Sequence, residues 1–338
     1  MTKALYGTLR AALLFWLDLT GNLKRWGFVA NPYDHCVMNK TIEGSQCTII
    51  WHVDDLKISH VNPDVVTAII SLLQGVYGKT VPLTETRGTK HDYLGMQIDF
   101  STKGKVKFLM EEYITNILST APSDFDGESA TPAAAHLFEI NPTPTLLDKE
   151  QAESFHHMVA QLLFLCKRAR PDIQTAIAFL CTRVKSPDVD DWKKLGRVMK
   201  YLRATVSMPL TLEATNMSVV KWWVDASFAV HSDMKSHTGG AMSMGKGIVY
   251  ATSTRQKLNT KSSTEAELVG VSDVLPQVLW TRYFLMAQGY KGCETVVYQD
   301  NQSAILLEKK TEECRVVNEL GTSTYAISLM RIESKQVN

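Results

Sequence analysis

The stretch Cys47-Thr-Ile-Ile-Trp-His-Val-Asp-Asp-Leu-Lys-Ile-Ser59 places two adjacent carboxylates, Asp54 and Asp55, between two apolar runs. The runs predict the two strands of a β-hairpin that carries the acids at its tip. Adjacent carboxylates repel each other, a divalent cation relieves that repulsion, and two-metal nucleotidyl transfer needs such a platform. Aspartate is also common in turns for backbone reasons. The pair alone therefore leaves a metal site and a plain turn both open.

The composition is that of a globular protein with a sizeable core. The chain has 338 residues, enough for two or three domains, with 45% hydrophobic and 21% charged residues. Its net charge of +1 means that any nucleic-acid binding must come from local basic patches. Six cysteines are scattered without a C-x-x-C pair, which argues against a zinc site or a disulfide framework and fits a reducing setting. No stretch of eighteen residues is apolar and free of charge, so no membrane span is expected.

The periodicity of apolar residues divides the chain into two α/β regions and a helical one. The spacing predicts helices over 3–26, 63–77, 111–118, 151–204 with breaks at its prolines, and 264–288. Alternation predicts strands within 36–60 and over 93–100, 105–109, 219–224 and 294–298. Residues 121–150 are rich in proline and in small or acidic residues, have no sustained period, and indicate a linker.

Three further acids lie at the ends of predicted elements in the second α/β region. Asp225 ends one strand, Asp300 ends another, and Glu267 lies in the first turns of the helix that opens near Ser262. Carboxylates at the carboxyl ends of neighbouring strands, joined by one from a helix, can converge on one cleft. Such a set could hold two magnesium ions about 4 Å apart for attack of water on a phosphodiester. Each acid is equally explained alone as a turn former or helix-terminal charge, and Glu265 has the same helix-capping spacing as Glu267.

These residues belong to an ordered series of motifs. They include Lys3-Ala-Leu-Tyr-Gly7, Trp51-His-Val-Asp-Asp55, Tyr93-Leu-Gly95, Arg170-Pro-Asp-Ile173, Asp225-Ala226, Lys261-Ser-Ser-Thr-Glu-Ala-Glu-Leu268 and Asp300-Asn-Gln-Ser-Ala304. In this order the series resembles the C-terminal part of the polyprotein of copia-type LTR retrotransposons, over nearly the whole chain.

The resemblance implies a fold class and a domain plan. The fold expected is α/β (α+β): a partial polymerase palm with antiparallel hairpins, a helical connection, and a ribonuclease H-like mixed sheet flanked by helices. The corresponding ranges are a truncated reverse transcriptase palm over 1–120, a linker over 121–150, a helical connection or thumb-like region over 151–212, and a ribonuclease H-like domain over 213–338.

The resemblance also assigns roles to the acids. Asp54 and Asp55 correspond to two of three polymerase metal ligands, and Asp225, Glu267 and Asp300 to three of the four ribonuclease H acids. Glu267 is preferred to Glu265 because the family's ligand directly precedes an apolar pair, as in Glu267-Leu-Val269. The implied cofactor is Mg²⁺ or Mn²⁺, and the implied reaction is metal-dependent cleavage of RNA in RNA–DNA hybrids.

Two departures from the family pattern weaken the expected activities. The family's first polymerase aspartate precedes the helix that starts here at residue 3, so we expect little RNA-directed DNA polymerase activity. Near the C-terminus, Ala326 and Ser328 stand where the family has a histidine and an acid or amide. The alternative to a weakened ribonuclease H is a non-catalytic nucleic-acid-binding relic of a decayed element.

The expected partners are an RNA–DNA hybrid and a primer–template, and no membrane. Arg255, Lys257 and Lys261 precede the Glu267 helix and could steady phosphates beside the cleft, although a solvated basic loop explains them as well. The cysteines and the resemblance to a retroelement lead us to expect an intracellular protein, either cytoplasmic in virus-like particles or nuclear.

Overall fold

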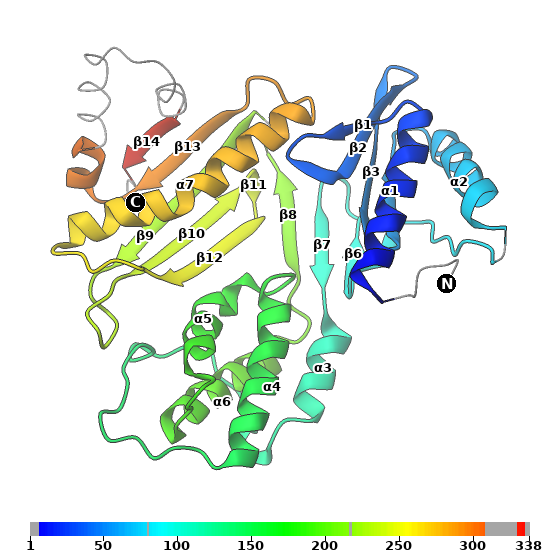
Figure 1. Cartoon of the computed structure of the whole chain (residues 1–338). Helices are drawn as coiled ribbons and strands as arrows, with labels where there is room; N and C mark the ends of the chain where they lie inside the picture. The colour runs from blue at the N-terminus through cyan, green and yellow to red at the C-terminus, as the bar shows by residue number, and fades with distance from the viewer. Residues whose placement is uncertain (1–6, 80, 216–217, 308–329, 335–338) are drawn as a thin grey trace. The chain divides into compact units, whose positions relative to one another are not determined.

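The chain folds into two compact units (Figure 1). The computed structural model describes residues 7–79, 81–215, 218–307 and 330–334. Unit 1 comprises Met1–Gly88 and Trp280–Lys291, and unit 2 comprises Thr89–Leu279 and Gly292–Asn338. The mixed α/β architecture with antiparallel hairpins confirms the predicted fold class. None of the helices in the described ranges is both long and apolar enough to cross a membrane.

Unit 1 is an antiparallel sheet of order β1-β2-β3-β4 packed against helices. Its elements are α1 (Leu9–Arg25), β1 (Val29–Asn31), β2 (Asp34–Ile42), β3 (Ser45–His52), β4 (Asp55–Ser59) and α2 (Pro63–Tyr77). Thr8 caps α1, and Asn62 with Pro63 starts α2, which is the usual chemistry of helix N-termini. The buried core is built by side chains such as Leu19, Met38 and Ile49.

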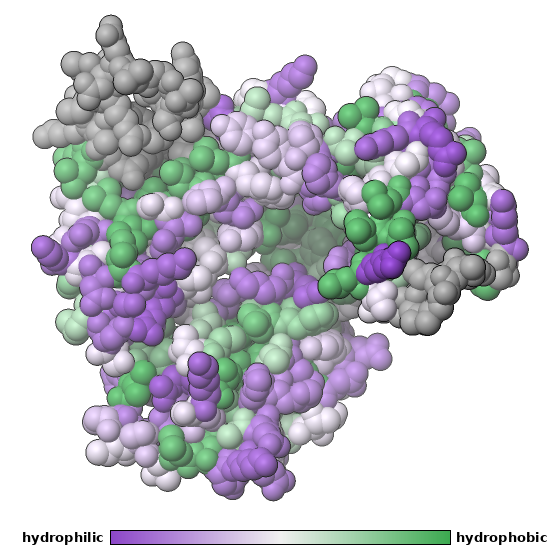
Figure 2. Space-filling view, in the orientation of Figure 1, coloured by the Kyte–Doolittle hydropathy of each residue, from purple (hydrophilic) through white to green (hydrophobic). Residues whose placement is uncertain are grey.

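The part of α1 that faces away from this core carries several large apolar side chains among its charged ones. Leu9, Leu13, Leu14 and Leu17 are all exposed, and green surface lies over this helix in Figure 2. The last turns of α7 (Ser263–Ala287) also belong to unit 1, because the region from Trp280 packs within it. There the Trp280 indole donates to the Tyr33 carbonyl at 3.1 Å, and Tyr283 stacks on the Tyr33 ring.

Unit 2 contains a five-stranded mixed sheet of order β12-β10-β9-β13-β14. Its strands are β9 (Val219–Ser227), β10 (His237–Ser243), β12 (Tyr250–Arg255), β13 (Glu294–Gln299) and β14 (Met330–Ser334). β9, β10 and β12 are antiparallel, whereas β13 runs parallel to β9 and β14 runs parallel to β13. The parallel pair β9 and β13 places the carboxyl ends of both strands at one edge of the sheet.

Helix α7 covers one face of this sheet, and glycines allow the close approach (Figure 1). A Cβ atom at Gly240 would lie 2.9 Å from a methyl group of Val274 on α7 and 3.0 Å from the methyl group of Thr252. At the neighbouring Gly239, on the other face, a Cβ atom would meet nothing nearer than 3.8 Å. The two glycines therefore differ sharply in what a side chain would encounter.

We expect Gly240→Ala to lower the free energy of unfolding by about 1–3 kcal/mol, because the added methyl group overpacks the helix–sheet contact. Gly239→Ala is the matched control, and we expect it to be neutral or to stabilise by up to about 1 kcal/mol because glycine weakens a strand interior. Urea unfolding of both variants measures the difference. Equal stabilities for the two would contradict this account of the packing.

A second sheet of unit 2 has the order β11-β8-β7-β6-β5. It is formed by β5 (Lys90–Tyr93), β6 (Met96–Asp99), β7 (Val106–Leu109), β8 (Leu210–Ala214) and β11 (Gly245–Lys246). β6 and β7 confirm most of the strand predicted over 93–100 and its partner predicted over 105–109. The start of the first prediction is wrong, because Leu94 and Gly95 have φ of 53° and 78° and form a tight turn between β5 and β6. Two successive residues with positive φ are typical of a two-residue hairpin turn.

The helical part of unit 2 has its own core. It consists of α3 (Glu111–Ser119), α4 (Lys149–Cys166), α5 (Gln174–Arg183) and α6 (Val189–Ala204). Residues 121–147 lie within the range 121–150 that was expected as a linker, and they contribute buried Phe125 and Leu137 to this core. It is also tied to α6, since the Trp192 indole donates to Asp124 at 2.6 Å and Arg203 pairs with Asp126 at 3.1 Å. We call residues 121–147 the strap.

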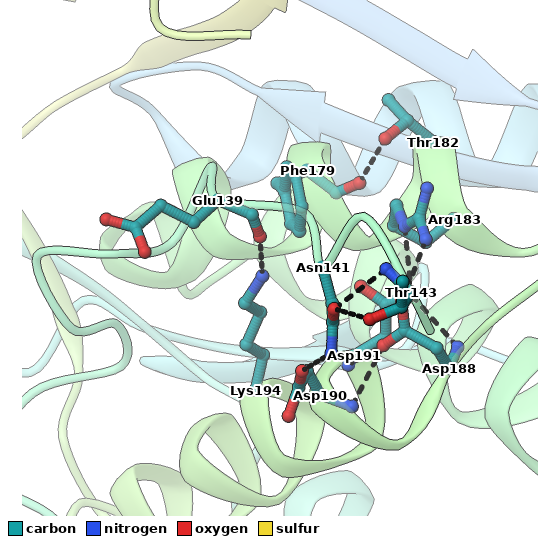
Figure 3. A network of polar contacts seen from close by, with 10 residues as sticks. All are labelled: Glu139, Asn141, Thr143, Phe179, Thr182, Arg183, Asp188, Asp190, Asp191 and Lys194. Atoms are coloured by element: carbon teal, nitrogen blue, oxygen red, sulfur yellow. Dashed lines mark hydrogen bonds and ion pairs between the residues drawn. The ribbon is translucent and has the colours of Figure 1, made fainter. Parts of the chain in front are cut away.

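Buried ion pairs fix the start of α6 beside the strap, as Figure 3 shows. Asp188 and Asp191 form a capping box, and both are 2% exposed. The Arg183 guanidinium on α5 donates to Asp191 at 2.9 Å and to Asp188 at 3.2 Å, which compensates two buried carboxylates. The Lys194 ammonium lies over the Phe179 ring and donates to the Glu139 carbonyl of the strap.

Candidate metal centre

The acids Asp225, Glu267 and Asp300 come together at one edge of the mixed sheet. Each offers a carboxylate oxygen, and these oxygens all lie within 4.8 Å of one another. Asp225 lies near the carboxyl end of β9 and Asp300 directly follows β13, so the parallel pairing of these strands makes them neighbours. Within the described residues, this is the one group of three or more acids, histidines or cysteines with such geometry.

The start of α7 separates the roles of its two glutamates. The Ser262 hydroxyl accepts the backbone N–H of Glu265 at 3.2 Å, and the Glu265 carboxylate accepts the backbone N–H of Lys261 at 2.7 Å. Glu265 therefore caps the exposed helix terminus. Glu267, two residues later, is 6% exposed and turns into the cluster with Asp225 and Asp300.

Electrostatics inside the cluster favour a cation. Burial raises the pKa of Glu267, and the nearby carboxylates of Asp225 and Asp300 raise it further, while hydrogen bonds from Gln299 and from the backbone of Ala226 oppose the shift. Asp225 and Asp300 are exposed, so ligands in solution can reach them. Three oxygen donors at this spacing fit hard divalent cations, which prefer carboxylate ligands and keep several waters.

A cleft of about 270 Å³ opens beside the carboxylates on the sheet face opposite α7. Asp225 and Asp300 line one part of it, and Gln174 at the start of α5 lines another. Trp223 and Tyr298, from neighbouring positions of β9 and β13, stack at 5.4 Å and also line it. The cleft gives an extended ligand room next to the acids.

Asp54 and Asp55 lie where the sequence predicts them, at the exposed tip of the hairpin between β3 and β4. His52 pairs with Asp55, which leaves Val53 and Asp54 as a two-residue turn. Val53 has φ of 56°, a left-handed conformation that strains a β-branched residue. Within the described residues, no third acid, histidine or cysteine completes a metal-binding group with this pair.

The predicted phosphate contacts lie around the loop between β12 and α7. Arg255 ends β12 and pairs with Asp233, so part of its charge is already compensated. Lys257 and Lys261 are exposed in the loop that leads to α7. Ala326 and Ser328, the two departures near the C-terminus, fall outside the described residues.

Sequence reasoning missed one residue of the site. Gln299, the last residue of β13, is 2% exposed, and its side-chain amide donates to the Glu267 carboxylate at 3.0 Å. A glutamine at the end of a strand carries no signal in sequence, because it is neither a metal ligand nor a turn former. Only the pairing of β13 with β9 beneath α7 brings it to the carboxylate.

The chain is similar to retrotransposon proteins and to a solved viral structure. No protein-family model matches the chain. It is 27% identical over 318 residues to a retrovirus-related Pol polyprotein from transposon TNT 1-94 of Nicotiana tabacum, which covers 92% of the chain and 24% of the polyprotein. It is 25% identical to a transposon Ty5-1 protein of Saccharomyces cerevisiae, over 81% of the chain and 87% of that protein.

A solved structure shares the fold. The foamy viral protease-reverse transcriptase in complex with an RNA/DNA hybrid matches all of the chain with a TM-score of 0.53 and 14% identity, over 39% of its own length. The chain thus spans about a quarter of the tobacco polyprotein and well under half of the viral protein. These matches confirm the predicted resemblance and indicate a reverse transcriptase and ribonuclease H-like origin. The homologues of the chain are copia-type retrotransposon Pol polyproteins, and they match most of its length.

Proposed function

We propose that the chain hydrolyses the RNA strand of RNA–DNA hybrids with two divalent cations, Mg²⁺ or Mn²⁺, held by Asp225, Glu267 and Asp300. One observation carries the proposal: three carboxylates from three different elements have oxygens within 4.8 Å of one another. The origin of the homologues supports the nuclease, and the hybrid bound to the viral structure supports the substrate class.

The three carboxylates differ in burial, and we assign them different roles accordingly. Glu267 is held from both sides, by Gln299 and by the backbone of Ala226, so it offers a fixed ligand. Asp225 and Asp300 are exposed, so a phosphodiester can reach them from solvent. Bound divalent cations supply charge neutralisation at the phosphate and activation of water for in-line attack.

The surroundings suit a nucleic-acid strand. The cleft with Trp223 and Tyr298 begins at the carboxylates, and aromatic side chains interact with bases or sugars irrespective of sequence. Lys257 and Lys261 add positive charge near the start of α7. Contacts from such side chains to phosphates position a strand without recognising its base sequence. We also propose that the hairpin with the exposed pair Asp54 and Asp55 descends from the metal-binding hairpin of a polymerase.

The test is cleavage of an end-labelled RNA–DNA hybrid in Mg²⁺, in Mn²⁺ and in EDTA. We expect cleavage with either cation and none in EDTA. Removing a side chain that only orients a metal ligand usually lowers metal affinity or activity by about 10- to 100-fold. Asp225→Asn and Glu267→Gln change the ligands themselves, so we expect each to lower the cleavage rate by more than about 100-fold.

Two matched carboxylates serve as controls. Glu265→Gln removes the capping carboxylate of the same helix, and Glu294→Gln removes a carboxylate at the opposite end of β13. Both variants should cleave at the wild-type rate. If the wild-type chain binds the hybrid tightly but does not cleave it, the proposal is wrong and the chain is a non-catalytic nucleic-acid-binding protein.

A further inference from the structure

A single buried side chain joins the helix and the strand that supply two of the carboxylates. The Gln299 Nε2 donates to Glu267 Oε2 at 3.0 Å across the gap between β13 and α7. Its Oε1 accepts the backbone N–H of Asp300 at 2.7 Å and that of Asn301 at 3.0 Å. Both ends of the amide are therefore used, and Gln299 is 2% exposed.

The amide acts at the point where the chain leaves the sheet. After β13 the backbone must turn so that the Asp300 carboxylate points toward Asp225, and the two N–H groups in that turn need an acceptor. Gln299 supplies it from its own side chain, and Asn301 continues the turn by accepting the Ala304 N–H at 3.0 Å. The backbone conformation that aims Asp300 therefore depends on Gln299.

The same amide restricts Glu267. A glutamate side chain has three rotatable bonds, and its carboxylate is repelled by the two neighbouring aspartates. The hydrogen bond from Gln299 fixes one oxygen of Glu267, in addition to the hydrogen bond that the carboxylate accepts from the backbone of Ala226. A donor without charge fits this place, because a cation would compete with a metal ion for the carboxylates and an acid would add to the repulsion.

We propose that Gln299 is a positioning residue that holds Glu267 and Asp300 in metal-binding geometry before any cation arrives. This role rests on the proposed metal centre. Side chains that orient metal ligands commonly contribute 10- to 100-fold in metal affinity. Gln299 differs from them in serving two ligands at once, one through its side chain and one through the backbone turn.

The experiment measures Mn²⁺ affinity of the full chain by isothermal titration and by electron paramagnetic resonance of free Mn²⁺. Gln299→Met has nearly the same shape and neither donor nor acceptor, and we expect its dissociation constant to rise by about 10- to 100-fold. Gln299→Asn keeps a buried amide, but it is one methylene too short to bridge β13 and α7, so we expect loss in the same direction. The Asn variant decides the result if the Met variant does not fold.

The matched control is Gln161→Met, which removes a half-buried amide on α4 in the helical core. Its Mn²⁺ affinity should equal that of wild type. Urea unfolding without metal confirms that each variant is folded, and a residue that only fills space would change stability but not affinity. Wild-type affinity in a folded Gln299→Asn or Gln299→Met variant would overturn the role while leaving the metal centre intact. A wild-type chain without Mn²⁺ binding would overturn the metal centre and this role together.

Discussion

Replacing Arg170 by methionine is expected to lower the free energy of unfolding of unit 2 by about 3 kcal/mol. The Arg170 side chain is 1% exposed, donates to both oxygens of Asp172, and donates to the carbonyl and hydroxyl of Thr205 at 2.9 and 2.7 Å. Breaking a buried ion pair from one side costs about 3–5 kcal/mol. The lower end applies because the Asp172 side chain keeps 28% of its surface in water.

Urea unfolding measures this loss, and an exposed ion pair provides the control. Lys193 pairs with Asp190, with 71% and 42% of the two side chains exposed. Lys193→Met should therefore change the free energy of unfolding by less than about 1 kcal/mol. Similar losses in the two variants would show that the Arg170 network stabilises the helical part no more than a surface contact does.

Acidification from pH 7 to pH 5 is expected to lower the free energy of unfolding by about 2 kcal/mol through one buried histidine. His237 is 7% exposed, and its ring contacts Ser253 at 2.7 Å and His231 at 3.0 Å beneath Phe138. Burial, with a smaller contribution from His231, lowers the pKa of His237 from 6.5 to about 4.

The sign follows from which state binds the proton. Below pH 6.5 His237 is protonated in the unfolded chain but stays neutral in the folded chain. The free energy of unfolding therefore falls between pH 6.5 and about 4. His231 shifts in the same direction, because burial and the charge of Arg255 lower its pKa more than Asp233 raises it. Both histidines thus act together in this pH range.

The pH dependence is separated from other groups by substitution. His237→Gln should reduce the difference in unfolding free energy between pH 7 and pH 5 by about 2 kcal/mol, whatever it does to stability at pH 7. His157→Gln, at an exposed position of α4, should leave the difference unchanged. A wild-type free energy of unfolding that is the same at pH 7 and pH 5 would show that the folded chain protonates these histidines as readily as the unfolded chain does.

Local patterns in the sequence were sufficient for most elements and for the convergence of the acids. The hairpin around Asp54 and the helix over 63–77 are confirmed, because alternation and 3.6-residue spacing report directly on burial. The meeting of Asp225 and Asp300 follows from a general property of sheets, namely that parallel neighbours end at the same edge, and Glu267 joins them from the helix that begins beside it.

The features that escaped prediction depend on partners far away in the chain. β8 (Leu210–Ala214) is a short strand that pairs with β7, about a hundred residues earlier, and nothing local marks it. The strap has no sustained period because its buried side chains reach the core singly, Phe125 from a short 3-10 helix and Leu137 from irregular backbone. Gln299 escaped for a related reason, since its partner Glu267 lies on another element.

The strap has a practical consequence for dividing this protein into pieces. Its linker-like composition suggests a boundary at which the two halves could be expressed separately. However, Phe125 is 2% exposed and Leu137 is 6% exposed, because both pack against the helical core. A C-terminal piece that starts after the strap would show bare apolar surface where these side chains sit, and would tend to aggregate. A protease that nicks the strap should, by contrast, leave two fragments that stay together until a denaturant is added, since Trp192 and Arg203 still bind it.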